Sequence, residues 1–420
     1  MAETTPQPAQ SRRWYGLAYL VIFIAGVGFF LLSFLALGVL PGERLSASIA
    51  SHSQADMPDY TPAELRGRRI YTSLGCALCH TQQVRYLPAD VRRWGAPTDA
   101  WETRYDFPQL WGTRRIGPDL ARETQVRSND WQLTHLYQPQ WVVPDSVMPS
   151  FTWLFNGSPN RPSPAAQDLL AYLKTLGRAR QLGEGKRTGP RVDTGMDPAM
   201  WIEVAGLCAT PFINPNQARV AAGDPHLKLP VQHPDQLVSQ GRELFVQNCA
   251  GCHGATGDGN GPAAVGLLPR PADLRLSRFS TEALANSLWN GVAGSAMPAW
   301  RDLPARNIAS LIRYVQTLSL AAPDAQPVSA AVLARGAVVY AGNCVACHGV
   351  EGNGEGIAAP QRLPRPANFT AIQPAAIRVT QVLLHGVPGT SMPAWPSLDA
   401  ADQRAVSAFV RSFYPKEATP

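Results

Sequence analysis

The most apolar part of the chain lies near its N-terminus. No charged residue occurs between Arg13 and Glu43, and Trp14–Leu40 is almost entirely apolar. A helix needs about 20 such residues to cross a bilayer, whereas a cleaved signal peptide has an apolar stretch of about 7–15 residues. A buried helix of a soluble protein is the alternative interpretation. The length favours a single uncleaved transmembrane anchor over residues 14–41.

The charges beside this stretch predict its orientation. Arg12 and Arg13 flank its N-terminal end, and positive charges tend to remain on the cytoplasmic side of a membrane. Residues 1–13 are therefore expected to form a short cytoplasmic tail. Everything after Pro41 is expected on the opposite face, which is the periplasm in a bacterium.

The C-terminal half contains an internal repeat. A shift of 95 residues places Met-Pro-Ala-Trp at 297–300 on the same sequence at 392–395. The same shift places Leu-Pro-Arg-Pro-Ala at 268–272 on 363–367. Both copies end in a segment with apolar residues at helical spacing. The repeat predicts two copies of one small domain, over residues 237–320 and 332–420, with a short linker at 321–331.

The region between the anchor and the repeat has a related but larger pattern. A helix is predicted from about Gly67 to Leu74. A second one is capped by Ser163, starts at Pro164 and stops at Gly177. A long insert rich in Trp, Arg and Pro separates them. These signals predict a domain over 42–186 followed by a linker rich in Pro, Gly and Asn over 187–236.

Three copies of C-x-x-C-H give the chain its chemistry. This motif attaches c-type haem through two thioethers, and its His reaches the iron as proximal ligand. A zinc site or a redox dithiol is the alternative, but zinc-binding pairs usually lie closer together, and a redox pair needs no following His. We therefore predict three covalently bound haem c groups, on Cys76, Cys79 and His80; Cys249, Cys252 and His253; and Cys344, Cys347 and His348.

Each haem region also contains one methionine followed by proline. A Met thioether as second axial ligand raises the reduction potential of a haem and blocks the open iron position. A Met in a loop is otherwise usually a core filler. Because the pair recurs in equivalent places, the predicted second ligands are Met148, Met297 and Met392.

Other residues are candidates for supporting roles. A loop carbonyl should accept a hydrogen bond from each proximal His, and the prolines of three loops are the candidates: Pro118, Pro271 and Pro366. Arg270 and Arg365 can meet haem propionates or lie in solvent. His135 can contact a propionate, ligate iron or be structural, and Cys208 has no assigned function.

Composition adds modest limits. Hydrophobic residues make up 45% and charged residues 16%, and the net charge is +6 with a pI near 9.0. No basic run suggests a nucleic-acid partner. The predicted fold class is mainly α, with one N-terminal transmembrane helix followed by three cytochrome c domains.

The first haem region resembles a known family. The segments Cys79-His80-Thr81-Gln82-Gln83-Val84-Arg85, Gly117-Pro118-Asp119-Leu120 and Met148-Pro149-Ser150-Phe151-Thr152-Trp153 are similar to the monohaem subunit (FixO/CcoO) of cbb-type cytochrome c oxidases. The resemblance covers roughly residues 12–180. It implies a single-span subunit that lies beside a haem–copper catalytic subunit, with His80 and Met148 as axial ligands. The two domains that follow resemble the dihaem part of the third subunit (FixP/CcoP).

The resemblance implies an electron-transfer subunit that is not itself a catalyst. Electrons would come from a donor cytochrome or a cytochrome bc complex and would leave toward the oxidase subunit. The alternatives are an electron-input subunit of a nitric oxide reductase, a dihaem peroxidase and a free membrane-tethered carrier. A peroxidase needs an iron with an open position. The three candidate Met ligands argue against this alternative. The elaborate insert from Thr81 to Val147 favours a docked subunit over a free carrier.

Overall fold

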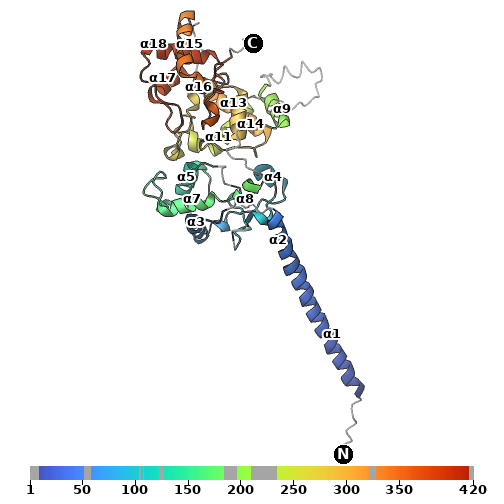
Figure 1. Ribbon diagram of the computed structural model, residues 1–420. Coiled ribbons are helices and arrows are strands. Elements are labelled where there is room, and N and C mark those ends of the chain that lie inside the picture. The colour runs from blue at the N-terminus through green and yellow to red at the C-terminus, as the bar shows by residue number, and fades with distance from the viewer. Residues whose placement is uncertain are drawn as a thin grey trace, which may run out of the picture.

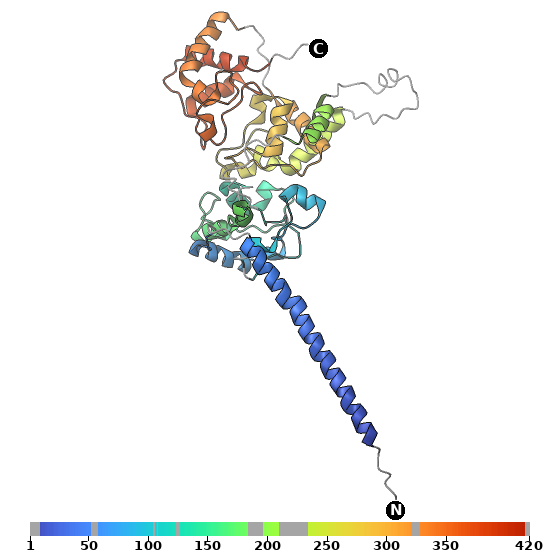
Figure 2. The ribbon, with the colours of Figure 1, turned by 45° about the vertical axis from the view of Figure 1, so that its right-hand side comes forward.

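The computed structural model is mainly helical, with a long N-terminal helix leading to three small domains that follow one another away from it (Figures 1 and 2). Strands β1 (Ser277–Phe279) and β2 (Ile372–Pro374) form a two-stranded sheet. The structure describes residues 9–51, 58–103, 106, 108–122, 127–183, 196–209, 234–320 and 328–415.

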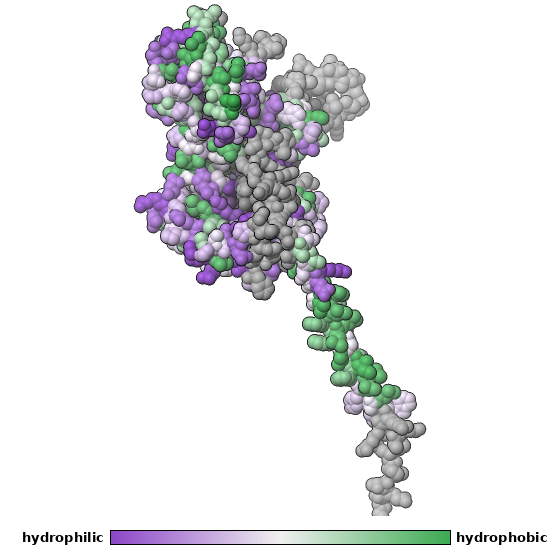
Figure 3. Space-filling view, in the orientation of Figure 1, coloured by the Kyte–Doolittle hydropathy of each residue, from purple (hydrophilic) through white to green (hydrophobic). Residues whose placement is uncertain are grey.

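The N-terminal helix is continuous through a proline. Helix α1 (Ala9–Phe34) passes through a π-helical turn (Leu35–Val39) into α2 (Leu40–Ser51). Pro41 cannot donate a backbone hydrogen bond, and the wider turn, in which Leu40 N–H donates to the carbonyl of Leu35, accommodates it. The helix therefore continues beyond Pro41. Its segment Trp14–Ser48 is long and apolar enough to cross a membrane, as the apolar surface in Figure 3 shows.

Each domain is built on the packing of the helix before its haem motif, here called its first helix, against a later helix, here called its last helix. The pairs are α3 (Pro62–Ser73) with α7 (Pro164–Leu173), α11 (Pro234–Asn248) with α14 (Ala305–Leu318), and α15 (Ala330–Asn343) with α18 (Ala400–Ser412). In the first domain the short α8 (Arg178–Gly183) follows this last helix. At each crossing a glycine of the first helix lies against a backbone carbonyl of the last helix. These contacts join Gly67 to Asp168, Gly241 to Ser310, and Gly336 to Ala405.

An aromatic pair lies one helical turn beyond each glycine contact. The ring centroids are 5.3 Å apart for Tyr71 and Tyr172, 5.3 Å for Phe245 and Tyr314, and 5.4 Å for Tyr340 and Phe409. Such pairs stabilise a core by about 0.5–1.5 kcal/mol beyond the area they bury. The haem motif follows directly in all three domains. The crossing therefore sets the position of each motif.

Shorter elements complete the domains. The first domain adds η2 (Cys76–Leu78), α4 (Pro88–Trp94), η3 (Ala100–Thr103), α5 (Asn129–Tyr137), α6 (Pro139–Val142), η4 (Thr152–Leu154) and α8 (Arg178–Gly183). The second adds α12 (Ala250–His253), η5 (Pro262–Gly266), η6 (Leu274–Leu276) and α13 (Thr281–Asn290). The third adds α16 (Val345–His348), η7 (Ala359–Gln361) and α17 (Ala376–His385).

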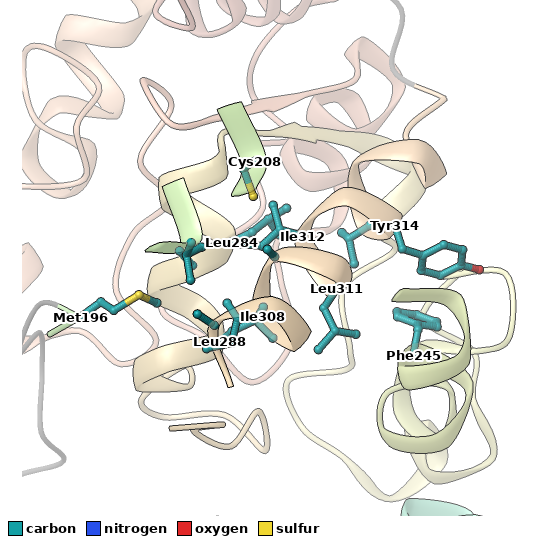
Figure 4. Close-up of a cluster of buried hydrophobic side chains, with 14 of the residues drawn as sticks. Met196, Cys208, Phe245, Leu284, Leu288, Ile308, Leu311, Ile312 and Tyr314 are labelled. Atoms are coloured by element: carbon teal, nitrogen blue, oxygen red, sulfur yellow. The ribbon is translucent and has the colours of Figure 1, made fainter. Parts of the chain in front are cut away.

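Part of the predicted linker is a packed helix. Helix α9 (Pro198–Ala209) places Val204, Cys208 and the neighbouring Met196 in the same buried cluster as Ile308 and Ile312 of α14 (Figure 4). Residues 196–209 thus add to the core of the second domain. The remaining linker residues, 187–195 and 210–233, lie outside the described residues.

The two repeats pack around an approximate two-fold axis. In the sheet Arg278 pairs with Gln373, its own equivalent in the other repeat, in antiparallel orientation. The flanking hydrogen bonds are reciprocal, because Ser280 N donates to Ala371 O (2.9 Å) and Ala375 N donates to Leu276 O (2.8 Å). Each residue of one bond lies 95 positions from its counterpart in the other. The interface is therefore isologous, like that of a symmetric dimer.

The second domain also contacts the first. Leu268 N donates to Asp130 Oδ2 (2.8 Å), and Asn160 Nδ2 donates to Val265 O (2.8 Å). Val142 of α6 lies in one apolar cluster with Cys252. The second domain thus lies between the first and the third.

Replacing Gly336 with Ala should destabilise the third domain. The added methyl group would overlap the carbonyl of Ala405, and such overpacking costs typically 1–3 kcal/mol. The control is Gly342→Ala in the same helix, where nothing lies within 4 Å of the added carbon. Ala in a helix is favoured over Gly by roughly 0.5–1 kcal/mol. Calorimetry of the full chain should show an unfolding transition at a lower temperature in Gly336→Ala but not in Gly342→Ala. Equal transitions in the two variants would contradict the packing assignment.

Three candidate haem c sites

The first site is assembled at the end of α3. Gly75 takes a left-handed conformation (φ 72°) and turns the chain into the short helix η2, which carries Cys76. His80 follows, and its Nδ1–H donates to the carbonyl of Pro118 at 2.8 Å. The predicted partner in this loop is therefore confirmed. The bond holds the tautomer in which Nε2 keeps its lone pair for a metal.

The loop of Pro118 approaches the ring of His80 very closely. A methyl group at Gly117 would overlap the imidazole. Any larger residue at this position would displace the ring of His80, which explains the glycine.

A buried polar network joins the segment after His80 to the loop of Pro118. The carboxylate of Asp119 is fully buried and accepts from the Thr81 hydroxyl and from Gln83 N (2.9 Å). Arg115 donates to Asp119 (3.2 Å) and to Asp90 (2.6 Å). Burial opposes ionisation of Asp90, but hydrogen bonds from arginines outweigh it and lower the pKa. These described residues of the insert thus support the segment after His80.

The proximal histidines of the repeats have different carbonyl partners from those predicted. His253 Nδ1–H donates to Ala272 O and His348 Nδ1–H to Ala367 O, both at 3.1 Å. The prediction of Pro271 and Pro366 was wrong by one residue in each case. The carbonyl of Pro271 lies instead beside Gly259. Successive carbonyls of an extended chain point to opposite sides, so the next one faces the histidine.

The ionisation of these side chains suits haem rather than a redox dithiol. Burial lowers the pKa of His80, His253 and His348, which keeps the rings neutral and able to bind a metal. Burial raises the pKa of Cys76 to about 11 and that of Cys249 to about 12. A redox pair would need a thiol with a lowered pKa.

The three Met-Pro loops share a feature that the sequence analysis missed. The backbone N–H of each methionine donates to a hydroxyl two residues earlier. The bonds are Met148 N to Ser146 Oγ (3.3 Å), Met297 N to Ser295 Oγ (3.2 Å) and Met392 N to Thr390 Oγ1 (3.1 Å). The pattern Ser/Thr-x-Met-Pro could have identified these loops directly. It gives the three methionines the same local conformation.

The third site encloses a cavity of about 330 Å³. Cys344, Cys347 and His348 line it together with Met392, and most of the other lining residues are apolar. An apolar cavity bounded by two thiols, an imidazole and a thioether fits a covalently attached haem. In the other domains the same residue types share a packed cluster: Cys76 with Met148, and Cys249 with Met297.

The two remaining candidates, His135 and Cys208, pack against other side chains of the protein. His135 stacks on Trp131 with ring centroids 4.7 Å apart. Burial lowers the pKa of His135 to about 4, so the ring is neutral, and its Nδ1 has no hydrogen-bond partner in the described part of the chain. Cys208 is buried in the core of the second domain, where Met200 also packs.

Family models match most of the chain in two parts. Residues 32–179 match the family described as cytochrome c oxidase, mono-heme subunit/FixO. Residues 236–315 and 331–410 each match the family described as cytochrome c oxidase, cbb3-type, subunit III.

Individual relatives agree with the second match. The chain is 28% identical to the cbb3-type cytochrome c oxidase subunit FixP of Azorhizobium caulinodans, over 41% of the chain and 59% of that protein. It is 27% identical to subunit CcoP of Cereibacter sphaeroides, over 52% of the chain and 73% of that protein. It thus spans less than two thirds of the first relative.

A solved chain of the Kuenenia stuttgartiensis reducing HAO-like protein complex is 24% identical over 42% of this chain and 96% of its own length, with a TM-score of only 0.22. The family matches carry the assignment. The chain therefore joins a FixO-type monohaem domain to two cytochrome c domains of the cbb3-type subunit III family.

Proposed function

We propose that this chain is a membrane-anchored trihaem c-type cytochrome that delivers electrons to the haem–copper catalytic subunit of a cbb-type oxidase. The observation that carries the proposal is the recurrence of one site in three contacting domains. Each has a C-x-x-C-H motif, a proximal His bonded to a loop carbonyl and a Met-Pro loop. Both family matches are to subunits of this type of oxidase.

The proposed axial ligands are His80 with Met148, His253 with Met297, and His348 with Met392. Each neutral imidazole has Nδ1 engaged, which leaves Nε2 for the iron. A methionine thioether as second ligand would close the iron to oxygen and favour electron transfer. Covalent attachment would use Cys76 with Cys79, Cys249 with Cys252, and Cys344 with Cys347. The chain needs no catalytic residue of its own.

The proposed electron path runs from the third domain through the second to the first. The middle position of the second domain supports this order, since it contacts both neighbours. The first domain is joined to the anchor, because α2 packs against η3. Its site would therefore lie near the membrane and the catalytic subunit. The third domain would meet the donor, a soluble cytochrome or a cytochrome bc complex.

The proposed orientation places residues 1–13 in the cytoplasm and the haem domains in the periplasm. The two arginines before the apolar helix support it. Haem c is attached in that compartment in bacteria, which is consistent with three C-x-x-C-H motifs on the far side of the anchor.

Mass spectrometry of the matured chain should show three covalent haem additions. The expectation follows from the three C-x-x-C-H motifs of the sequence. A matched control is Cys347→Ser together with Cys344→Ser, which should reduce the number to two. A stable wild-type species with two or fewer additions would contradict the proposed trihaem chain.

Replacing Met392 with Ala should lower the midpoint potential of the third haem and allow it to bind carbon monoxide. The change removes the thioether that would close the iron. Met200→Ala is the control, since Met200 packs in the core of the second domain. Visible spectra and redox titrations of both variants provide the measurement. An unchanged spectrum and potential in Met392→Ala would show that Met392 is not a ligand.

Removing residues 321–420 should slow oxygen uptake driven by a soluble cytochrome donor, but not by a small artificial reductant. The cut keeps α9 and the contact of the second domain with the first. Met148→Ala should slow uptake with either donor, because every electron would pass the first site. Equal rates of the full and shortened chains with the soluble donor would show that the third domain is not the entry point.

A further inference from the structure

The cavity of the third site has an unusual charge. Three arginines line it, Arg362, Arg365 and Arg378, and its lining among the described residues includes no Asp or Glu. Most of the remaining lining is apolar, for example Val379 and Leu383. A positive charge in apolar surroundings is costly unless an anion compensates it. The cavity therefore favours an anionic ligand.

Two of these arginines face inward. Nε and Nη1 of Arg365 are buried and have no hydrogen-bond partner in the described part of the chain. Arg378, on α17, is partly withdrawn from water, and this desolvation lowers its pKa even though Asp273 of the second domain opposes the shift. Ser277 of the second domain lines the same cavity. The site is thus built at the contact between the repeats.

The other repeat is an internal control, because it has the same fold without the same charges. The positions equivalent to Arg362 and Arg378 are Leu267 and Ala283. Arg365 corresponds to Arg270, which is exposed. At these equivalent positions the third site therefore has two positive charges that the second site lacks. Arg127 of the first domain also acts on Cys252 of the second site, but Asp130 has the opposite effect.

We propose that Arg365 and Arg378 bind the propionates of the third haem and raise its midpoint potential above that of the second. This rests on the proposed function, in that both domains must hold haem c. Guanidinium groups pair strongly with carboxylates, and more so where water is excluded. Oxidation adds one positive charge to the iron, and nearby arginines oppose it. Reduction of the third haem by an external donor is then more favourable.

Asp273 does not reverse this difference. It lies next to Ala272, the partner of His253, and its charge is balanced by Arg275 at 2.9 Å. The equivalent residue of the third domain is the uncharged Asn368. The Asp273–Arg275 pair and Asn368 are thus both close to neutral, and the difference in charge comes from the cavity arginines.

Exchange of residues between the repeats tests the proposal in the full chain. Arg378→Ala gives the third site the residue of the second, and Ala283→Arg makes the reciprocal change. Arg378→Lys keeps the charge, and Arg404→Ala removes the same charge from an exposed position of α18 outside the cavity lining. Redox titration gives the three midpoint potentials. The midpoint potential that changes in Met392→Ala is assigned to the third haem, and the one that changes in Met297→Ala is assigned to the second haem.

Arg378→Ala should lower the potential of the third haem, and Arg378→Lys should retain most of it. Ala283→Arg should raise the potential of the second haem, and Arg404→Ala should change neither. Mass spectrometry must first show that each variant carries three haems. Unchanged potentials in Arg378→Ala and Ala283→Arg would then overturn this proposal but not the proposed function. A wild-type chain that lacks haem in either repeat would instead refute the proposed function.

Discussion

The contact between a helix glycine and a backbone carbonyl is the constraint on which all three domains depend. Gly67, Gly241 and Gly336 let the first helix cross the last at a distance that any side chain would prevent. One turn later, an aromatic side chain of the first helix packs against an aromatic side chain of the last helix. Because each C-x-x-C-H motif begins where the first helix ends, the crossing fixes the cysteines and directs the histidine toward its loop carbonyl.

The same unit is used in two different ways. The repeats pair around an approximate two-fold axis, through reciprocal backbone bonds such as Ser280 to Ala371 and Ala375 to Leu276. The first domain instead contains an insert in which Arg115 and Asp119 support the segment after His80. Its surface toward the second domain places Val142 and Cys252 in one cluster. The result is a linear order of sites that ends next to the anchor.

Much of this order could be predicted from the sequence, because covalent haem attachment leaves a local motif and the repeat has no gaps. Carbonyl directions could not be predicted, since they depend on backbone alternation, and Ala272 and Ala367 were missed in favour of the adjacent prolines. Helix α9 was not predicted, because a short apolar segment near glycines shows no clear helical spacing of apolar residues. Arg365 was a candidate propionate contact from the sequence, but the fold was needed to place Arg362 and Arg378 in the same cavity.

The most direct test of the central claim is purification of the full chain from its membrane in mild detergent, followed by analysis of haem b and copper. The first domain matches the FixO family, and it lies next to the anchor because α2 packs against η3. The account predicts that a haem–copper subunit co-purifies, with haem b and copper in fixed proportion to the three haem c groups, and that the preparation reduces oxygen. A homogeneous trihaem chain that carries neither haem b nor copper, from membranes that contain an active haem–copper oxidase, would contradict it.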